Sequence, residues 1–336
     1  MELVLDYATD MSVRDASRRL NRLRHENTGI SAQTYRNTVE REGATIDVVI
    51  YEKCSETLQK NGFNMNGELE ENAEFTPEIS KYMQIEEIGC AMANLNIKKA
   101  HVSDYESEEI AVDISVDDVG VKRQTEIRPH GEEEQPKRVN NTVIHIENVK
   151  GKYILNSGSV FSSLRLLIGF LLCVGVLKKH LVFFTDGARE IHNEITRLFG
   201  FANYKIILDW YHLKKKCKEQ LSMALKSATI RNDFLEELLP CLWFGNINGA
   251  IKLLENIDVK KVKNSEIITK LIEYFERVRA YVPCYALRKE LGLRNSSNLG
   301  EKSNDLIVSS RQTCNECEQS SHAVHANQSK QWYELE

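Results

Sequence analysis

The sequence is poor in proline and has no long apolar run. Only 5 of its 336 residues are proline, while 42% are apolar and 28% are charged. This composition excludes a disordered or fibrous chain and is typical of a helix-rich globular protein with a sizeable core. The most apolar stretch, 164–177, has about the length of a buried core helix and contains Arg165, so we expect no membrane span.

Neither a strong excess of one charge nor a dense set of cysteines is present. The formal net charge of −5 excludes a uniformly basic nucleic-acid coat, so any nucleic-acid binding must use local patches. The 8 cysteines are scattered, and we expect reduced thiols rather than a disulfide framework. Residues 1–15 lack the basic-then-apolar order of a secretory signal, and a cytoplasmic location is therefore expected.

Residues 11–43 predict two short helices joined by a loop that contains Gly29. Ser12 and Ser31 are suitable N-caps for these helices. Seven arginines against four acidic residues make the unit positive, so we interpret it as a DNA-binding helix-turn-helix. The alternative is a plain helical hairpin with a solvated arginine face. The residues of the second helix that suit phosphate and base-edge contacts are Gln33, Thr34, Arg36 and Asn37.

The middle of the chain passes from an acidic segment to strand and helix patterns. Residues 66–88 carry seven glutamates and predict a loop or surface linker. Alternating apolar and polar residues over 109–129 predict two strands joined by a turn near Gly120, and 141–155 predicts a further strand pair. Helix and strand patterns then alternate as far as residue 226, which indicates a mixed sheet flanked by helices.

Aspartates close three of the predicted strands. Asp117 and Asp118 close the first, Asp186 closes a later apolar strand, and Asp209 closes the last. Since ligands of α/β sheets gather at the carboxyl ends of strands, we expect these side chains to converge. Converging carboxylates repel one another unless a cation lies between them, and Mg²⁺ prefers oxygen ligands. The alternative for Asp186 and Asp209 is helix capping, because each directly precedes a predicted helix.

Four segments of the chain stand in a characteristic order. They are SVDDVGVKRQ (115–124), FFTDGARE (183–190), LDWYHLKKK (208–216) and LRNSSNLGEKSNDLIVSSRQ (293–312). In this order the chain resembles bacterial insertion-sequence transposases of the DDE type, above all the group with an Asp-Gly-Ala motif followed by Leu-Asp-x-Phe/Tyr-His. The similarity runs from about residue 12 to 313, and it implies a catalytic domain with an RNase H-like fold.

The resemblance assigns the catalytic carboxylates of the family to particular residues. They fall on Asp117, Asp186 and Glu301, and Asp118 is an adjacent alternative to Asp117. The implied cofactor is Mg²⁺ or Mn²⁺, with two ions held by these carboxylates. The implied reaction is metal-dependent strand cleavage at transposon ends, followed by strand transfer into target DNA.

The same resemblance assigns accessory residues. Asp209 and His212 match the Leu-Asp-x-Phe/Tyr-His motif, and a structural role is the alternative for His212. Three lysines of the following helix are expected to support the DNA backbone, or else to form a solvated face. They are Lys214, Lys215 and Lys216.

The expected partner is double-stranded DNA, comprising transposon ends and target, with no membrane partner and with a homo-oligomer formed on the DNA. The alternatives are a catalytically inactive transposase remnant that only binds DNA, and another RNase H-like nuclease. Both ends of the chain depart from the family pattern, since relatives carry more sequence before the first helix and a Gly-Met-Ser-Trp block after Asn315. We therefore expect a copy shortened at both ends. Two cysteines and two histidines within 314–325 suggest zinc, but the pairs are closer than the roughly 12 residues of a zinc finger.

The expected fold class is α/β, with an RNase H-like mixed sheet flanked by helices, an N-terminal helix-turn-helix region and a helical insertion. The predicted units are a helical DNA-binding region over 1–65, an acidic linker over 66–108, the catalytic core over 109–227, the helical insertion over 228–292, and a C-terminal helix with the catalytic glutamate and a degenerate tail over 293–336.

Overall fold

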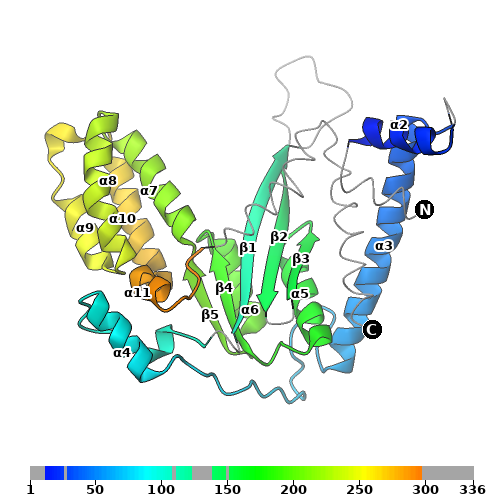
Figure 1. Ribbon diagram of the computed structural model, residues 1–336, viewed down its shortest axis with the longest axis horizontal. Helices are drawn as coiled ribbons and strands as arrows, with labels where there is room; N and C mark the ends of the chain where they lie inside the picture. Colours follow the sequence, from blue (N-terminus) through cyan, green and yellow to red (C-terminus); the bar gives the residue numbers. More distant parts are fainter. Residues whose placement is uncertain (1–11, 26–28, 108–110, 123–137, 149–150, 297–336) are drawn as a thin grey trace.

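The computed structural model describes residues 12–25, 29–107, 111–122, 138–148 and 151–296. Within these residues a five-stranded mixed sheet lies at the centre of the molecule, with helices on both faces (Figure 1). The prediction of an α/β chain with a mixed sheet flanked by helices is therefore confirmed. Across the same residues, no helix combines the length and the apolar character needed to cross a membrane.

The sheet has the strand order β3-β2-β1-β4-β5. Its strands are β1 (Ala111–Lys122), β2 (Arg138–Asn148), β3 (Gly151–Ser157), β4 (His180–Thr185) and β5 (Tyr204–Leu208). β2 pairs antiparallel with both β1 and β3, while β4 runs parallel to β1 and β5. Every residue of β4 is buried, and its four central residues, 181–184, are all apolar, as is typical of a central parallel strand.

The prediction of two strands with a turn near Gly120 is wrong. β1 is one continuous strand that passes through Gly120 and stays paired with β2 along its whole course beyond Asp113. Glycine permits a turn but does not require one, and the cross-strand pairing decides the conformation here. The further strand pair predicted over 141–155 is confirmed as β2 and β3.

One face of the sheet packs against α5 (Val160–Val174) and α6 (Arg189–Phe199), and α3 (Ala32–Lys60) packs in turn on α5. Arg165 of α5 is buried in this layer and donates from Nε to the carbonyl of Met65 at 2.5 Å and from Nη2 to Ser55 Oγ at 2.6 Å. The apolar helix therefore belongs to the protein core.

The other face of the sheet packs against the C-terminal helices, which share a second core cluster with β4 and β5 (Figure 1). They are α7 (Trp210–Ala224), α8 (Ala228–Trp243), α9 (Ile247–Glu255), α10 (Ser265–Val278) and α11 (Tyr285–Glu290).

The N-terminal helix α2 (Val13–Leu23) packs across the amino end of α3 (Figure 1). Ala16 and Leu20 of α2 bury against Tyr35 and Val39 of α3. The predicted caps are confirmed, since Ser12 accepts a hydrogen bond from Asp15 N and Ser31 accepts one from Thr34 N. The second helix is longer than the unit 11–43 and continues to Lys60, within the region over 1–65 that was predicted to be helical.

The segment 66–108, interpreted from its composition as an acidic linker, contains helix α4 (Ile85–Asn94). A capping box formed by Gln84 and Glu87 starts α4. Ile88 and Ala91 then pack in one cluster with Leu287 of α11. The segment is therefore held against the body of the molecule.

A buried ion pair joins this segment to α11. Arg288 donates from Nη2 to Glu106 Oε1 at 2.5 Å and from Nη1 to Oε2 at 3.0 Å, and neither side chain is more than 2% exposed. Burial by itself raises the pKa of Glu106, but the charge and hydrogen bonds of Arg288 outweigh it and hold that pKa below its ordinary value. The pair therefore fixes α11 beside the segment that leads into β1.

Candidate active site at the carboxyl edge of the sheet

The register of two parallel strands brings the predicted catalytic aspartates to one edge of the sheet. The last registered pair of β1 and β4 is Val116 with Thr185. The next residues along the two strands are Asp117 and Asp186. Both therefore reach the carboxyl edge at the same level, although they are far apart in the sequence.

Asp117 and Asp118 extend toward opposite faces of the sheet, because side chains alternate along a strand. Asp118 lies opposite Thr142 of β2, whose Oγ1 donates to Asp118 Oδ1 at 2.5 Å. Burial raises the pKa of Asp118, the Thr142 hydrogen bond opposes this, and the charges of Asp186 and Glu190 raise it further. The pKa of Asp118 therefore lies above its ordinary value, and Asp118 and Asp186 are close enough to repel each other.

Asp186 lies in the short connection between β4 and α6. Its Oδ1 accepts a hydrogen bond from Ala188 N at 2.8 Å, while Ala188 itself occupies the N-cap position of α6. The alternative of Asp186 as the N-cap is therefore wrong. Gly187 has φ +84°, and a Cβ there would lie 2.9 Å from Leu208 Cδ1. Glycine thus directs the chain into α6 directly behind the carboxylate.

Asp209 has a structural position at the end of β5. It is buried and caps α7, accepting at Oδ1 from Tyr211 N at 2.7 Å and from His212 N at 3.2 Å. The capping alternative for Asp209 is confirmed. Ser296 Oγ also donates to this oxygen at 3.2 Å, so the last described residue lies against the start of α7.

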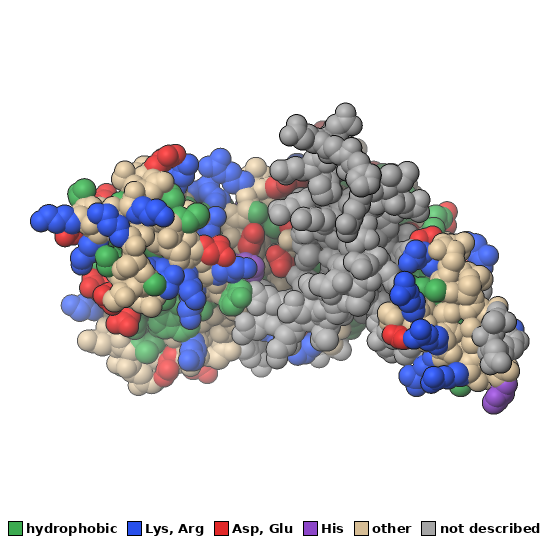
Figure 2. Space-filling view, turned by 90° about the horizontal axis from the view of Figure 1, so that it is seen from above, with side chains coloured by type: hydrophobic (Ala, Val, Ile, Leu, Met, Phe, Trp, Pro, Cys, Tyr) green, Lys and Arg blue, Asp and Glu red, His purple; other side chains and the backbone are tan. Residues whose placement is uncertain are grey.

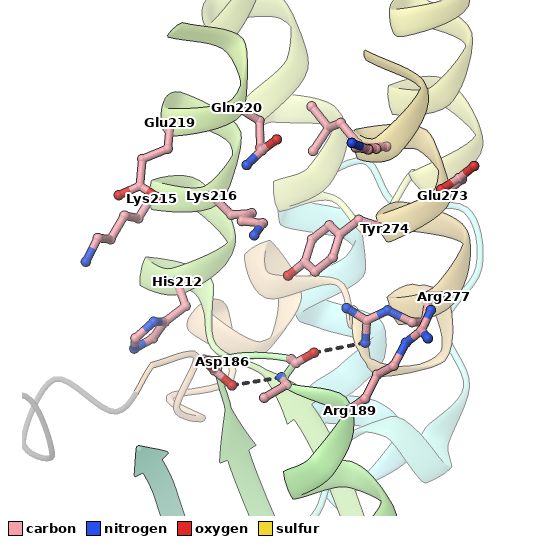
Figure 3. A pocket seen from close by; sticks show the side chains of 14 residues that line it. Asp186, Arg189, His212, Lys215, Lys216, Glu219, Gln220, Glu273, Tyr274 and Arg277 are labelled. Atoms are coloured by element: carbon pink, nitrogen blue, oxygen red, sulfur yellow. Dashed lines mark hydrogen bonds between the residues drawn. The ribbon is translucent and has the colours of Figure 1, made fainter. Parts of the chain in front are cut away.

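A pocket of about 620 Å³ opens beside Asp186 between α7 and α10 (Figure 3). His212, Lys215 and Lys216 line it together with Asp186, whereas Lys214 is exposed elsewhere on α7. Sequence reasoning missed several other lining residues, although Arg189 directly follows the Asp-Gly-Ala motif. The missed residues include Arg189, Gln220, Lys270, Tyr274 and Arg277.

The residues predicted to read DNA lie on the side of the sheet away from this pocket (Figure 1). Gln33, Thr34 and Asn37 are exposed, and Gln33 donates from Nε2 to Asn37 Oδ1 at 2.8 Å. Arg36, which we expected to contact DNA, is half-buried, because it lies beside the face of α3 that packs on α2.

The arginines of α2 and its C-cap are exposed more fully than Arg36. Lys and Arg side chains gather over this end of the molecule and over the C-terminal helices, with acidic side chains between them (Figure 2). The exposed arginines are Arg14, Arg18, Arg19, Arg22 and Arg24.

Several predicted residues lie outside the described part of the chain, including Glu301, Asn315 and the cysteines and histidines within 314–325. Among the described residues, no group of three His, Cys, Asp or Glu could hold a metal ion. Glu301, the third predicted carboxylate, stands five positions after Ser296 in the sequence.

Comparison with known proteins gives no match, either among models of protein families or among curated proteins. The function of the chain has therefore to be inferred from the site and from the order of its sequence motifs.

Proposed function

We propose that this chain is a metal-dependent DNA strand-cleaving enzyme of the DDE transposase type, with an RNase H-like core. The main observation that supports this proposal is the register of β1 and β4, which brings Asp117 and Asp186 to the same carboxyl edge of the sheet. The strand order and the single antiparallel strand, β2, are compatible with that fold. The ordered sequence motifs point to the same family.

The side chains at this edge suit a hard divalent cation. The donors are carboxylate oxygens. Burial and the charge of Asp186 raise the pKa of Asp118, and a shared cation would remove the repulsion between the two carboxylates. Asp117, Asp186 and Glu301, with Asp118 as the alternative to Asp117, would hold Mg²⁺ or Mn²⁺. The bound ions would polarise the phosphodiester and lower the pKa of the attacking water.

The remaining residues of the site would bind and orient the DNA. Asp209 fixes the start of α7, and α7 in turn presents His212, Lys215 and Lys216 beside Asp186. These side chains suit contacts with phosphate oxygens. Catalysis would thus depend on carboxylates at the ends of strands and on basic side chains of the capped helix α7.

Binding of double-stranded DNA would also use the N-terminal helices. The five exposed arginines at α2 form a positive surface that suits phosphate contacts, in the role expected of the helix-turn-helix region. Two separated basic regions with acidic side chains between them would suit a long DNA partner (Figure 2). In line with the resemblance, we infer a homo-oligomer on DNA.

A nicking assay tests this function. DNA carrying the sequences that flank the gene is incubated with the protein in Mg²⁺ or Mn²⁺, and nicks are counted on a denaturing gel. Wild type should nick, Asp186→Asn and Glu301→Gln should lose the activity, and Glu236→Gln, an exposed change on α8, should keep it. Nicking by Asp186→Asn at the wild-type rate would refute the assignment. DNA binding without nicking in either metal would favour the inactive remnant instead.

A further inference from the structure

The pocket beside Asp186 is rich in cations. Five basic side chains line it against three carboxylates, Asp186, Glu219 and Glu273. The basic residues are Arg189, Lys215, Lys216, Lys270 and Arg277. This surplus favours an anionic ligand over a cationic one.

Tyr274 gives the pocket a hydrogen-bond donor. Its hydroxyl is buried, with no hydrogen-bond partner in the described part of the chain. Burial raises the pKa of Tyr274, Cys217 and Asp186 act in the same direction, and Arg277 opposes them, so the phenol stays protonated at neutral pH. A buried donor without a partner is uncommon in folded proteins, and a bound water or ion is one explanation for it.

The cations and the phenol lie together. Lys216 Nζ lies 5.8 Å from the centroid of the Tyr274 ring, and the Arg277 guanidinium lies 5.2 Å from it. Arg277 is also anchored, since Nη1 donates to the carbonyl of Gly187 at 2.9 Å. Figure 3 shows Tyr274 in the gap between α7 and α10, with Lys216 on one side and Arg277 on the other.

The amino end of α6 forms another wall of the pocket. Its N-cap, Ala188, has no side chain that could accept from the first amides of the helix. The positive end of the helix dipole therefore adds to the field of the basic side chains.

We propose that this pocket binds the phosphate backbone of a DNA strand beside the bond held at the aspartates, with Tyr274 as hydrogen-bond donor and Lys216 and Arg277 as countercharges. The anion site follows from the pocket alone, whereas DNA as the source of the phosphate rests on the proposed function. Two features favour a strand over a free phosphate ion. The cavity of about 620 Å³ is much larger than one phosphate, and Asp186 lies both in its wall and at the carboxylate edge.

The test measures binding in EDTA, so that it is independent of metals and of cleavage. A fluorescent single-stranded hexanucleotide is titrated with the full chain, and its anisotropy gives the affinity. Lys216→Gln removes a charge that lines the pocket, and Tyr274→Phe removes only the hydroxyl. Hydrogen bonds to charged groups are strong enough that each change should weaken binding about tenfold. Lys218→Gln, a lysine exposed on α7 outside the pocket, should leave the affinity unchanged.

The stability of Tyr274→Phe distinguishes a binding role from a structural one. Since the hydroxyl makes no hydrogen bond in the described structure, the variant should melt at the wild-type temperature or slightly above it without ligand. Weaker hexanucleotide binding with unchanged melting supports the proposal.

Three results would overturn it. They are wild-type affinity in both pocket variants, an equal loss in Lys218→Gln, and displacement of the hexanucleotide by an equal concentration of inorganic phosphate. If nicking fails while binding depends on Tyr274 and Lys216, the proposed function falls but the anion site stands. If nicking occurs while both variants bind normally, the proposed function stands and the anion site is refuted.

Discussion

Val116 of β1 and Thr185 of β4 lie opposite each other as the last registered pair of two parallel strands, and an aspartate follows each of them. Thr185 is also fixed from the side, since its Oγ1 shares a hydrogen bond of 2.7 Å with His192 Nε2 of α6. The level of the two carboxylates is thus set by strand pairing, which positions catalytic groups more rigidly than a loop does.

The burial of the Asp118 carboxyl, together with its repulsion from Asp186, predicts that Asp118→Asn stabilises the metal-free protein. The pKa of Asp118 is raised in the folded state. The contribution of this carboxyl to folding stability is therefore fully present below its unfolded pKa, and it is lost as pH rises through the folded pKa and the carboxyl ionises. The asparagine keeps the acceptor for Thr142 Oγ1. The melting temperature in EDTA at pH 7 should therefore rise by about 1–2 °C.

The difference between Asp118→Asn and wild type should close near pH 3, where Asp118 is protonated in both states. Added Mn²⁺ should raise the melting temperature of wild type more than that of the variant. A variant less stable than wild type at pH 7 in EDTA would show that the ionised Asp118 carboxyl does not destabilise the folded protein.

Substitution of Gly187 should lower the free energy of unfolding, whereas substitution of Gly89 should not. Gly187→Ala forces a left-handed φ on alanine and places its Cβ against Leu208, so we expect a loss of about 1–3 kcal/mol in urea unfolding. Gly89, exposed inside α4, has nothing within 4 Å of the added Cβ, and Gly89→Ala should stabilise by about 0.5–1 kcal/mol. Equal effects of the two changes would show that the Asp186 turn is not constrained.

The buried pair of Glu106 and Arg288 should contribute strongly to stability. Arg288→Met leaves the Glu106 carboxylate buried without its partner, and about 3–5 kcal/mol should be lost at pH 7 in urea unfolding. Glu276→Gln, which breaks the exposed pair with Arg279, is the control and should cost at most about 1 kcal/mol.

The loss in Arg288→Met should depend on pH. Because the folded pKa of Glu106 is lowered, the contribution of the pair is present above the unfolded pKa and is lost as pH falls through the folded pKa. The difference between Arg288→Met and wild type should therefore narrow below pH 4. A constant difference from pH 7 to pH 3 would mean that Glu106 is not the charged partner.

The arginines of α2 should govern the salt dependence of DNA binding. Arg18 and Arg22 are both exposed, and removing one arginine that neutralises a phosphate should reduce the slope of log K against log salt by about 1. Arg18→Gln and Arg22→Gln should each show this change with duplex DNA. Asn37→Ala, which removes a side chain hydrogen-bonded to Gln33, should leave the slope unchanged. An unchanged slope in both arginine variants would remove α2 from the DNA-binding surface.

Local patterns predicted much of the fold. Ser12 and Ser31 mark helix starts through their own side chains, and the unbroken apolar run of β4 marks a central strand. These features depend on residues within one turn or one strand. The capping box of Gln84 and Glu87 was an equally local signal for α4, but the acidic composition around it favoured a linker.

Contacts between distant parts of the chain could not be predicted. Glu106 and Arg288 are 182 positions apart, and nothing in either segment indicates the other. Tyr274 reaches the neighbourhood of Asp186 only because α10 packs on α7. The strand end at Asp186 was thus readable from the sequence, whereas the pocket beside it was not.

Direct Mn²⁺ binding tests the central claim that Asp186 and the aspartates of β1 form a divalent-cation site. Calorimetric titration compares wild type, Asp186→Asn and the exposed control Glu236→Gln. We expect wild type and the control to bind alike, and Asp186→Asn to bind Mn²⁺ roughly tenfold or more weakly, because the carboxylate charge holds the cation. Mn²⁺ binding by Asp186→Asn with the wild-type affinity would contradict the claim.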